Sequence, residues 1–179
     1  MSFPTYSMIV LFIAIFGAFS TFSHPIKSEP DTISTKGIRL GHIQDLINQW
    51  GGRDALLDLT TADVCQKYLK PMTAASSLSL SSQYLTDPRQ KDNVGDAEWF
   101  VSHAWMFNFL DVYDSMVHFF KGNKSVIVWF DMFSNSQHNT AVKPFSWWET
   151  TFMESIKTIG KVVMILQPFK DPIPLKRAW

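Results

Sequence analysis

Three short apolar runs, each followed by polar residues, dominate the second half of the chain. They cover residues 98–102, 125–130 and 161–166. Runs of this length between turn residues are typical of strands that are buried on both faces, as in a parallel sheet. Segments 107–120 and 147–159 separate the runs and have the apolar spacing of amphipathic helices. The pattern predicts strand, helix, strand, helix, strand, joined by right-handed crossovers.

The part of the chain before these runs has helical periodicity. A first helix is predicted by apolar residues at i, i+3, i+4 and i+7, which are Ile43, Leu46, Ile47 and Trp50. Gly51 follows as a stop signal. Thr60 or Thr61 is expected to cap a second helix that ends before Pro71. Residues 40–95 are therefore predicted to be a helical lead-in that finishes in a polar loop.

The amino terminus contains an unbroken apolar run at residues 8–19. A membrane-spanning helix needs about twenty apolar residues, so no stable membrane span is predicted. The run fits the apolar region of a secretory signal peptide over residues 1–23, although no Lys or Arg precedes it. A genuine leader predicts secretion, whereas a gene-model artefact predicts a cytoplasmic protein. Residues 24–39, with two prolines and little periodicity, are predicted to be a linker.

Composition narrows the function classes. The sixteen basic residues are balanced by sixteen acidic ones, and this neutrality argues against nucleic acid as a partner. A hydrophobic content of 46 % and an aromatic content of 15 % are enough to build a core. Cys65 is the single cysteine, so neither an internal disulfide nor a cysteine-type zinc site is expected.

Polar side chains follow the first two predicted strands. Because the carboxyl ends of parallel strands meet at one edge of a sheet, these side chains are expected to border a ligand pocket. The candidates are Ser102, His103 and Trp105 from the first strand, and Asp131, Gln137 and His138 from the second strand and its loop.

Two kinds of catalytic site are disfavoured at this edge. Ser102 and His103 are adjacent in a strand and point to opposite faces, so they cannot act as nucleophile and base. The spacing of His103, Asp131 and His138 is not diagnostic of a metal site, and hydrogen bonds that order a loop are the favoured role for them. The pair Trp147-Trp148 could form a stacking platform for a ligand, but its place at the start of an amphipathic helix favours one core indole and one partly exposed indole.

Several of these segments together resemble a TIR-like (Toll/interleukin-1 receptor-like) domain. The similar segments are Trp99-Phe-Val-Ser-His-Ala-Trp105, Val128-Trp-Phe-Asp-Met-Phe-Ser-Asn-Ser-Gln-His138, Lys161-Val-Val-Met-Ile-Leu-Gln-Pro-Phe169 and Asp171-Pro-Ile-Pro-Leu-Lys-Arg-Ala-Trp179. The lead-in at residues 59–73 is similar as well, so the resemblance covers roughly residues 40–179. It is closest to a divergent group in protists, algae and small invertebrates.

The resemblance implies an α/β fold with an incomplete flavodoxin-like parallel sheet. Residues 96–179 would form the truncated TIR-like domain, with its three strands in the order 2-1-3 and flanking helices. The family's nucleotide pocket would involve Ser102, His103, Trp105 and Asp131, with NAD as a candidate ligand and no required cofactor. Enzymatic members use a glutamate just beyond a Trp-Cys pair. Trp179 aligns with that Trp, which makes it a further candidate for the ligand pocket, and it ends the chain. No catalytic residue is therefore assigned, and Glu149 and Glu154 do not match the glutamate.

The functional expectation is a signalling or defence module that acts by association with itself or with other TIR-like domains. An open edge at Val162–Leu166 would favour such self-association. One alternative is an NAD hydrolase whose catalytic glutamate lies beyond the end of this chain. A second alternative is a secreted binding protein, which depends on the leader alone.

Overall fold

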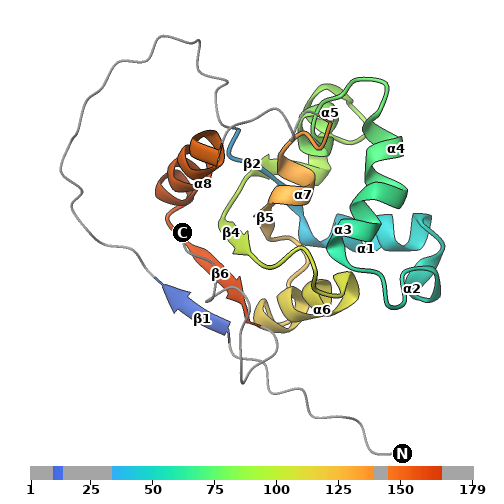
Figure 1. The fold of residues 1–179 in the computed structure, drawn as a ribbon, viewed down its shortest axis with the longest axis horizontal. Coiled ribbons are helices and arrows are strands. Elements are labelled where there is room, and N and C mark those ends of the chain that lie inside the picture. The colour runs from blue at the N-terminus through green and yellow to red at the C-terminus, as the bar shows by residue number, and fades with distance from the viewer. Residues whose placement is uncertain (1–9, 14–33, 139–144, 167–179) are drawn as a thin grey trace, which may run out of the picture.

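The computed structural model describes residues 10–13, 34–138 and 145–166, which form a mixed α/β fold (Figure 1). Its six-stranded sheet has the order β1-β6-β4-β5-β2-β3. The strands are β1 (Val10–Ile13), β2 (Lys36–Arg39), β3 (Val94–Asp96), β4 (Trp99–Ser102), β5 (Ile127–Phe130) and β6 (Val162–Ile165). The central strand β4 is parallel to both β5 and β6, and the outer pairs are antiparallel.

The expectation of a three-stranded sheet is wrong, although the three apolar runs do form strands β4, β5 and β6. Strand β2 comes from the end of the predicted linker, and β3 begins in the predicted polar loop. Each of these two strands has a single large apolar residue, Ile38 or Val94, so the hydrophobic pattern does not mark them. Pairing fixes them instead, because Ile38 lies opposite Val94 on one side and Val128 on the other.

Gly37 is needed for this pairing. A Cβ atom at this position would collide with the carbonyl oxygen of Val128 in β5. The close backbone approach between β2 and β5 is therefore open to glycine only.

The expectation that Val162–Leu166 forms an open edge is also wrong, because strand β6 is paired on both sides. Strand β1 pairs antiparallel with β6 over its whole length, from Val10 opposite Ile165 to Ile13 opposite Val162. β1 belongs to the apolar run that was predicted to be a leader. A short apolar run fits a sheet strand as well as a leader, and periodicity alone does not distinguish them. The argument for self-association through a bare β6 edge is therefore removed.

The two faces of the sheet are covered unequally (Figure 1). Phe100, Trp129 and Val162 share one face and pack against α8 (Phe145–Ile159), which contributes Phe152, Ile156 and Ile159. The opposite face joins the larger core. The helices of that side are α1 (Leu40–Gln49), α2 (Gly52–Ala55), α3 (Thr61–Val64), α4 (Lys70–Thr73), α5 (Leu80–Thr86), α6 (Phe109–Phe119) and α7 (Asp131–Ser134).

Helix α1 follows its sequence pattern. The four residues at helical spacing, Ile43 to Trp50, are all buried. The helix ends before Gly51, which has a φ of +105° that a residue with a side chain rarely adopts. Burial of one apolar stripe against the core therefore accounts for this helix.

The second predicted helix begins as expected and ends later than expected. Thr60 caps α3 in a capping box with Asp63. The helical backbone then continues through a π-helical turn, η1 (Cys65–Leu69), into α4, so the predicted end before Pro71 is wrong. A proline ring clashes with the carbonyl four residues earlier in an α-helix, and the wider π turn directly before Pro71 relieves that clash.

One short element remains. A 3₁₀ turn, η2 (Lys91–Asn93), leads into β3. Across the ranges that the structure describes, no helix has the length and apolar character needed to cross a membrane.

Candidate functional site

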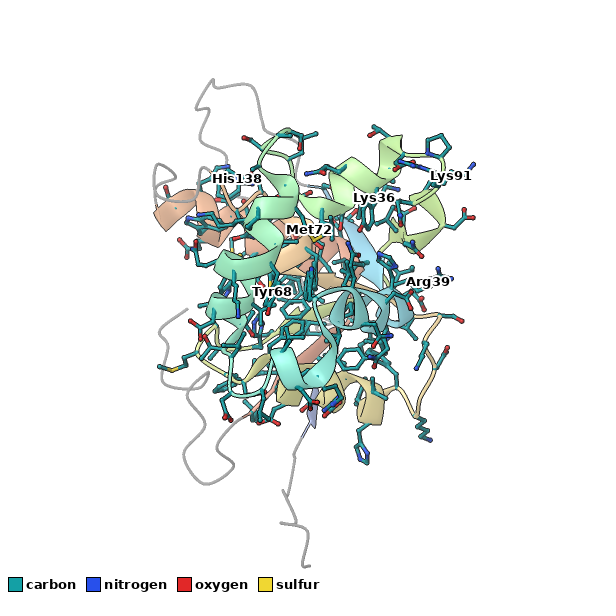
Figure 2. All side chains as sticks on the ribbon, turned by 90° about the vertical axis from the view of Figure 1, so that its right-hand side faces the viewer. Lys36, Arg39, Tyr68, Met72, Lys91 and His138 are labelled. Carbon is teal, nitrogen blue, oxygen red and sulfur yellow. The ribbon has the colours of Figure 1, made fainter. Side chains whose placement is uncertain are left out.

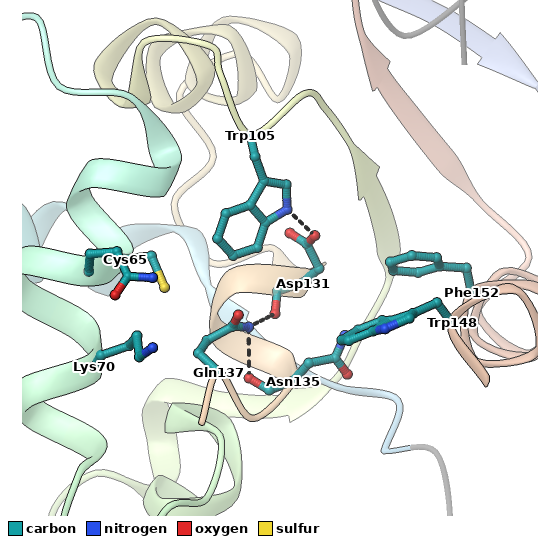
Figure 3. Close-up of a pocket in the computed structure, with 9 residues that line it drawn as sticks. Cys65, Lys70, Trp105, Asp131, Asn135, Gln137, Trp148 and Phe152 are labelled. Atoms are coloured by element: carbon teal, nitrogen blue, oxygen red, sulfur yellow. Dashed lines mark hydrogen bonds between the residues drawn. The ribbon is translucent and has the colours of Figure 1, made fainter. Parts of the chain in front are cut away.

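A pocket of about 400 Å³ lies at the carboxyl ends of β4 and β5 (Figure 3). Three parts of the fold surround it: the helix that runs from α3 to α4, the segments that follow the two strands, and α8. The lining residues are Cys65, Gln66, Lys70, Trp105, Asp131, Asn135, Gln137, Trp148 and Phe152. The position agrees with the general rule that open α/β folds bind ligands beyond the carboxyl ends of their strands.

A hydrogen bond joins the two strand ends inside the pocket. The indole Nε1–H of Trp105 donates to Asp131 Oδ2 at 2.6 Å. The other carboxylate oxygen, Oδ1, accepts from the backbone N–H of Met132 at 2.8 Å. Asp131 is the first residue of α7, where the backbone N–H groups of the first turn favour a carboxylate. Both oxygens of Asp131 therefore have donors within the protein.

Ser102 and His103 are not part of the pocket lining. Both are buried, and the His103 ring packs edge-on against Phe130 with ring centroids 4.6 Å apart. His103 Nδ1 is 3.9 Å from Asp131 Oδ1, which is beyond hydrogen-bond distance. The structure therefore places the His103 ring close to the carboxylate of Asp131, packed against Phe130.

Gln137 shapes the turn that follows α7. Its amide nitrogen donates to the backbone carbonyls of Asp131 at 3.0 Å, Met132 at 3.2 Å and Asn135 at 3.0 Å. Since Gln137 is buried and also lines the pocket, it fixes the backbone that carries Asn135 and forms part of the wall.

His138 lies outside the pocket lining and fastens the same loop to the helical lead-in. Its Nε2 is 2.8 Å from the hydroxyl of Thr73, beside the helix that carries Tyr68 and Met72 (Figure 2). Next to it, the hydroxyl of Ser136 donates to the carbonyl of Ser77 at 2.6 Å. These contacts hold the loop after β5 against α4 and against residues 74–77, which follow it.

The remaining predicted site residue, Trp179, lies outside the described residues. Of the other six, Trp105, Asp131 and Gln137 line the pocket, whereas Ser102, His103 and His138 are not part of its lining. The hypothetical metal set of His103, Asp131 and His138 is not assembled. Within the described ranges, no three His, Cys, Asp or Glu side chains gather in a way that could hold a metal ion.

Sequence reasoning missed the wall that comes from the helical lead-in, formed by Cys65, Gln66 and Lys70. These residues lie at the π turn and at the start of α4, and no local motif connects them to strand ends that follow in the chain. Among the residues that the structure describes, Lys70 forms no ion pair. Trp148 lies on the opposite wall, although a stacking platform was the less favoured interpretation of the Trp147-Trp148 pair in the sequence.

The chemistry of the lining favours binding over covalent chemistry. Burial raises the pKa of the Cys65 thiol to about 11, and the nearby charge of Lys70 only partly opposes this effect. The thiol is therefore protonated near neutral pH and is a poor nucleophile. What the pocket offers is one ammonium group, several amides and the aromatic surfaces of Trp148 and Phe152.

Comparisons of the chain with protein-family models, with curated proteins and with solved structures gave no match.

Proposed function

We propose that the protein is a TIR-like signalling or defence module with a flavodoxin-like sheet, whose pocket binds a small anionic ligand with a flat ring. Binding would regulate association with similar domains. The observation that carries the proposal is the placement of Lys70 and Trp148 on opposite walls of one pocket at the strand ends.

Each wall supplies a different part of ligand recognition. The ammonium group of Lys70 suits a phosphate or carboxylate, and the indole of Trp148 suits stacking against a planar ring. Asn135 and Gln137 add amide groups between them. A volume of about 400 Å³ lies in the lower part of the usual range for ligand sites, which suits a mononucleotide better than an extended dinucleotide.

Binding without turnover is the form of the proposal that the lining supports. The carboxylate of Asp131 already accepts two hydrogen bonds, and the Cys65 thiol is protonated. On α8, Glu149 and Glu154 are exposed, and Glu154 pairs with Lys157 at 2.9 Å. Neither glutamate appears among the residues of the pocket. The pocket lining therefore contains no glutamate that could stabilise a developing positive charge, and its one carboxylate, Asp131, is already held by two hydrogen bonds.

Calorimetric titration with AMP, NAD and nicotinamide mononucleotide tests the proposal. AMP or nicotinamide mononucleotide is expected to bind, and Lys70→Met should weaken that binding about tenfold, because one charge-assisted contact is lost. Trp148→Ala should weaken it by a similar factor.

Lys67→Met is the matched control, because Lys67 is an exposed lysine on the same helix and is absent from the pocket lining. Its affinity should equal that of the unsubstituted chain. Absence of binding by all three compounds, or equal effects of Lys67→Met and Lys70→Met, would contradict the proposal. Release of nicotinamide from NAD would favour the hydrolase alternative.

A further inference from the structure

Strand β1 is attached to the rest of the sheet by one ladder. It occupies the outermost position in the strand order, beside β6, and all four of its residues pair with that strand (Figure 1). An edge strand of four residues with one neighbour is among the least stable parts of a fold, so it opens at a lower cost in free energy than the sheet as a whole.

The edge of β6 that β1 covers is hydrophobic and pairs with β1 in one register. Val162, Val163 and Ile165 of β6 are buried, and the outer backbone groups of β6 face β1. Without β1, that row of N–H and C=O groups would be a template for another strand. The segment whose register fits the β6 edge is known from the structure: it is Val10–Ile13, which a second copy of the same sequence can supply.

The connection to β1 does not restrict the strand to its own chain. Residues 14–35 separate β1 from β2, and these strands are four strand spacings apart in the sheet. Four spacings amount to about 19 Å. A connection of this length spans up to roughly 70 Å when extended. It therefore has enough reach to place β1 on the β6 edge of a neighbouring molecule.

We propose that the β6 edge is a site of strand exchange between copies of this chain. In the monomer, a chain's own β1 closes the edge. In the dimer, Val10–Ile13 of a second copy takes the same antiparallel register opposite Val162–Ile165, as in other domain-swapped assemblies. The exchange itself does not involve the pocket. The inference rests on the proposed function only in so far as strand exchange would be the way in which the domains associate.

Engineered cysteines test the exchange in the full chain. Leu11 and Met164 are register partners, and directly opposite residues in antiparallel strands are close enough for a disulfide after small adjustments. A single-variant chain with Leu11→Cys is mixed with a second chain that carries Met164→Cys, and the mixture is oxidised. Exchange predicts a disulfide between the two chains. With an effective concentration in the millimolar range, about a tenth of the strands should be exchanged at about 100 μM protein.

Two further samples decide the outcome. Mixing the Leu11→Cys chain with a Lys161→Cys chain is the control, since Lys161 is exposed but lies outside the register of Leu11. The double variant Leu11→Cys/Met164→Cys should form an intrachain disulfide at low concentration. The proposal is overturned if the matched mixture cross-links no more than the control mixture, or if the double variant fails to cross-link although its thermal unfolding shows that it is folded.

Titration of AMP into the oxidised double variant separates this proposal from the proposed function. Locking β1 to its own β6 should leave ligand affinity unchanged and abolish dimers in light scattering. Dimers that persist in the locked chain would also overturn the exchange.

Discussion

The indole N–H of Trp105 donates to the carboxylate of Asp131 at 2.6 Å and thereby connects the segments that follow two neighbouring parallel strands. Trp105 follows β4, and Asp131 begins α7 directly after β5. The bond bridges residues that are 26 positions apart in the sequence and sets the floor of the pocket between the helical lead-in and α8.

Replacing Trp105 by Phe should therefore destabilise the fold. The substitution keeps an aromatic ring and removes the donor to Asp131, and a hydrogen bond to a charged group contributes about 1.5–3 kcal/mol. Urea unfolding should show a lower midpoint with an unchanged slope. Trp148→Phe is the matched control, because the same change there removes no hydrogen bond to Asp131. Equal midpoints for Trp105→Phe and the unsubstituted chain would show that the bond contributes nothing.

The contact between His138 and Thr73 should hold the loop after β5. Thr73→Val keeps the shape of the side chain and removes the hydroxyl that lies 2.8 Å from His138 Nε2 and 3.0 Å from the Leu69 carbonyl. We expect a loss of about 1 kcal/mol and faster amide exchange over residues 136–138. Thr86→Val is the control, since the hydroxyl of Thr86 donates to the nearby Gln83 carbonyl and, among the described residues, has no hydrogen bond with the loop after β5. Faster exchange at residues 136–138 in the control as well would argue against the contact.

Stability should depend on pH through His42. This side chain is buried between Asp45 and Tyr84, with Nδ1 and Nε2 each 3.3 Å from a partner oxygen. Desolvation lowers the pKa of His42 below its usual 6.5, and this effect outweighs the attraction of Asp45. The folded state therefore favours the neutral ring. Its contribution to stability is complete above about pH 6.5 and decreases as the pH falls towards the lower folded-state pKa.

Unfolding free energies measured from pH 5 to pH 8 check this expectation. The decrease below pH 6.5 should be smaller in His42→Gln than in the unsubstituted chain. His118→Gln, at an exposed position on α6, should leave the pH dependence unchanged. If the unfolding free energy of His42→Gln decreases below pH 6.5 as much as that of the unsubstituted chain, the pH dependence comes from other groups.

The thiol of Cys65 should be slow to react in the native protein. It is 1 % exposed, and its pKa of about 11 lies well above its ordinary value of 9.0. At pH 8 the thiolate fraction falls about a hundredfold relative to an ordinary cysteine, since each pKa unit is a factor of ten. Colour development with an aromatic disulfide reagent should therefore be at least a hundredfold slower in buffer than in guanidinium chloride. A native rate close to the denatured rate would show an accessible thiol.

The local sequence pattern determined the elements whose burial repeats with a fixed period. Strands β4, β5 and β6 are continuous apolar runs, and α1 carries its buried residues at helical spacing. Each of these elements can therefore be recognised from a few consecutive residues. The polar residues at the strand ends also pointed to the edge of the sheet where the structure has a pocket. Trp105, Asp131 and Gln137 line the pocket because the carboxyl ends of neighbouring parallel strands lie at the same edge of the sheet.

Tertiary structure alone decided the features that depend on partners distant in sequence. Ile38 and Val94 become strand residues only through pairing across the sheet, and Val10–Ile13 becomes an edge strand only because β6 offers a row of backbone groups. Lys70 reaches the site because the helical backbone that begins at α3 continues through the π turn η1 into α4. Hydrophobic periodicity reports whether a residue is buried, but not which distant segment buries it. That is why the sequence predicted one side of the pocket and the tertiary structure supplied the other.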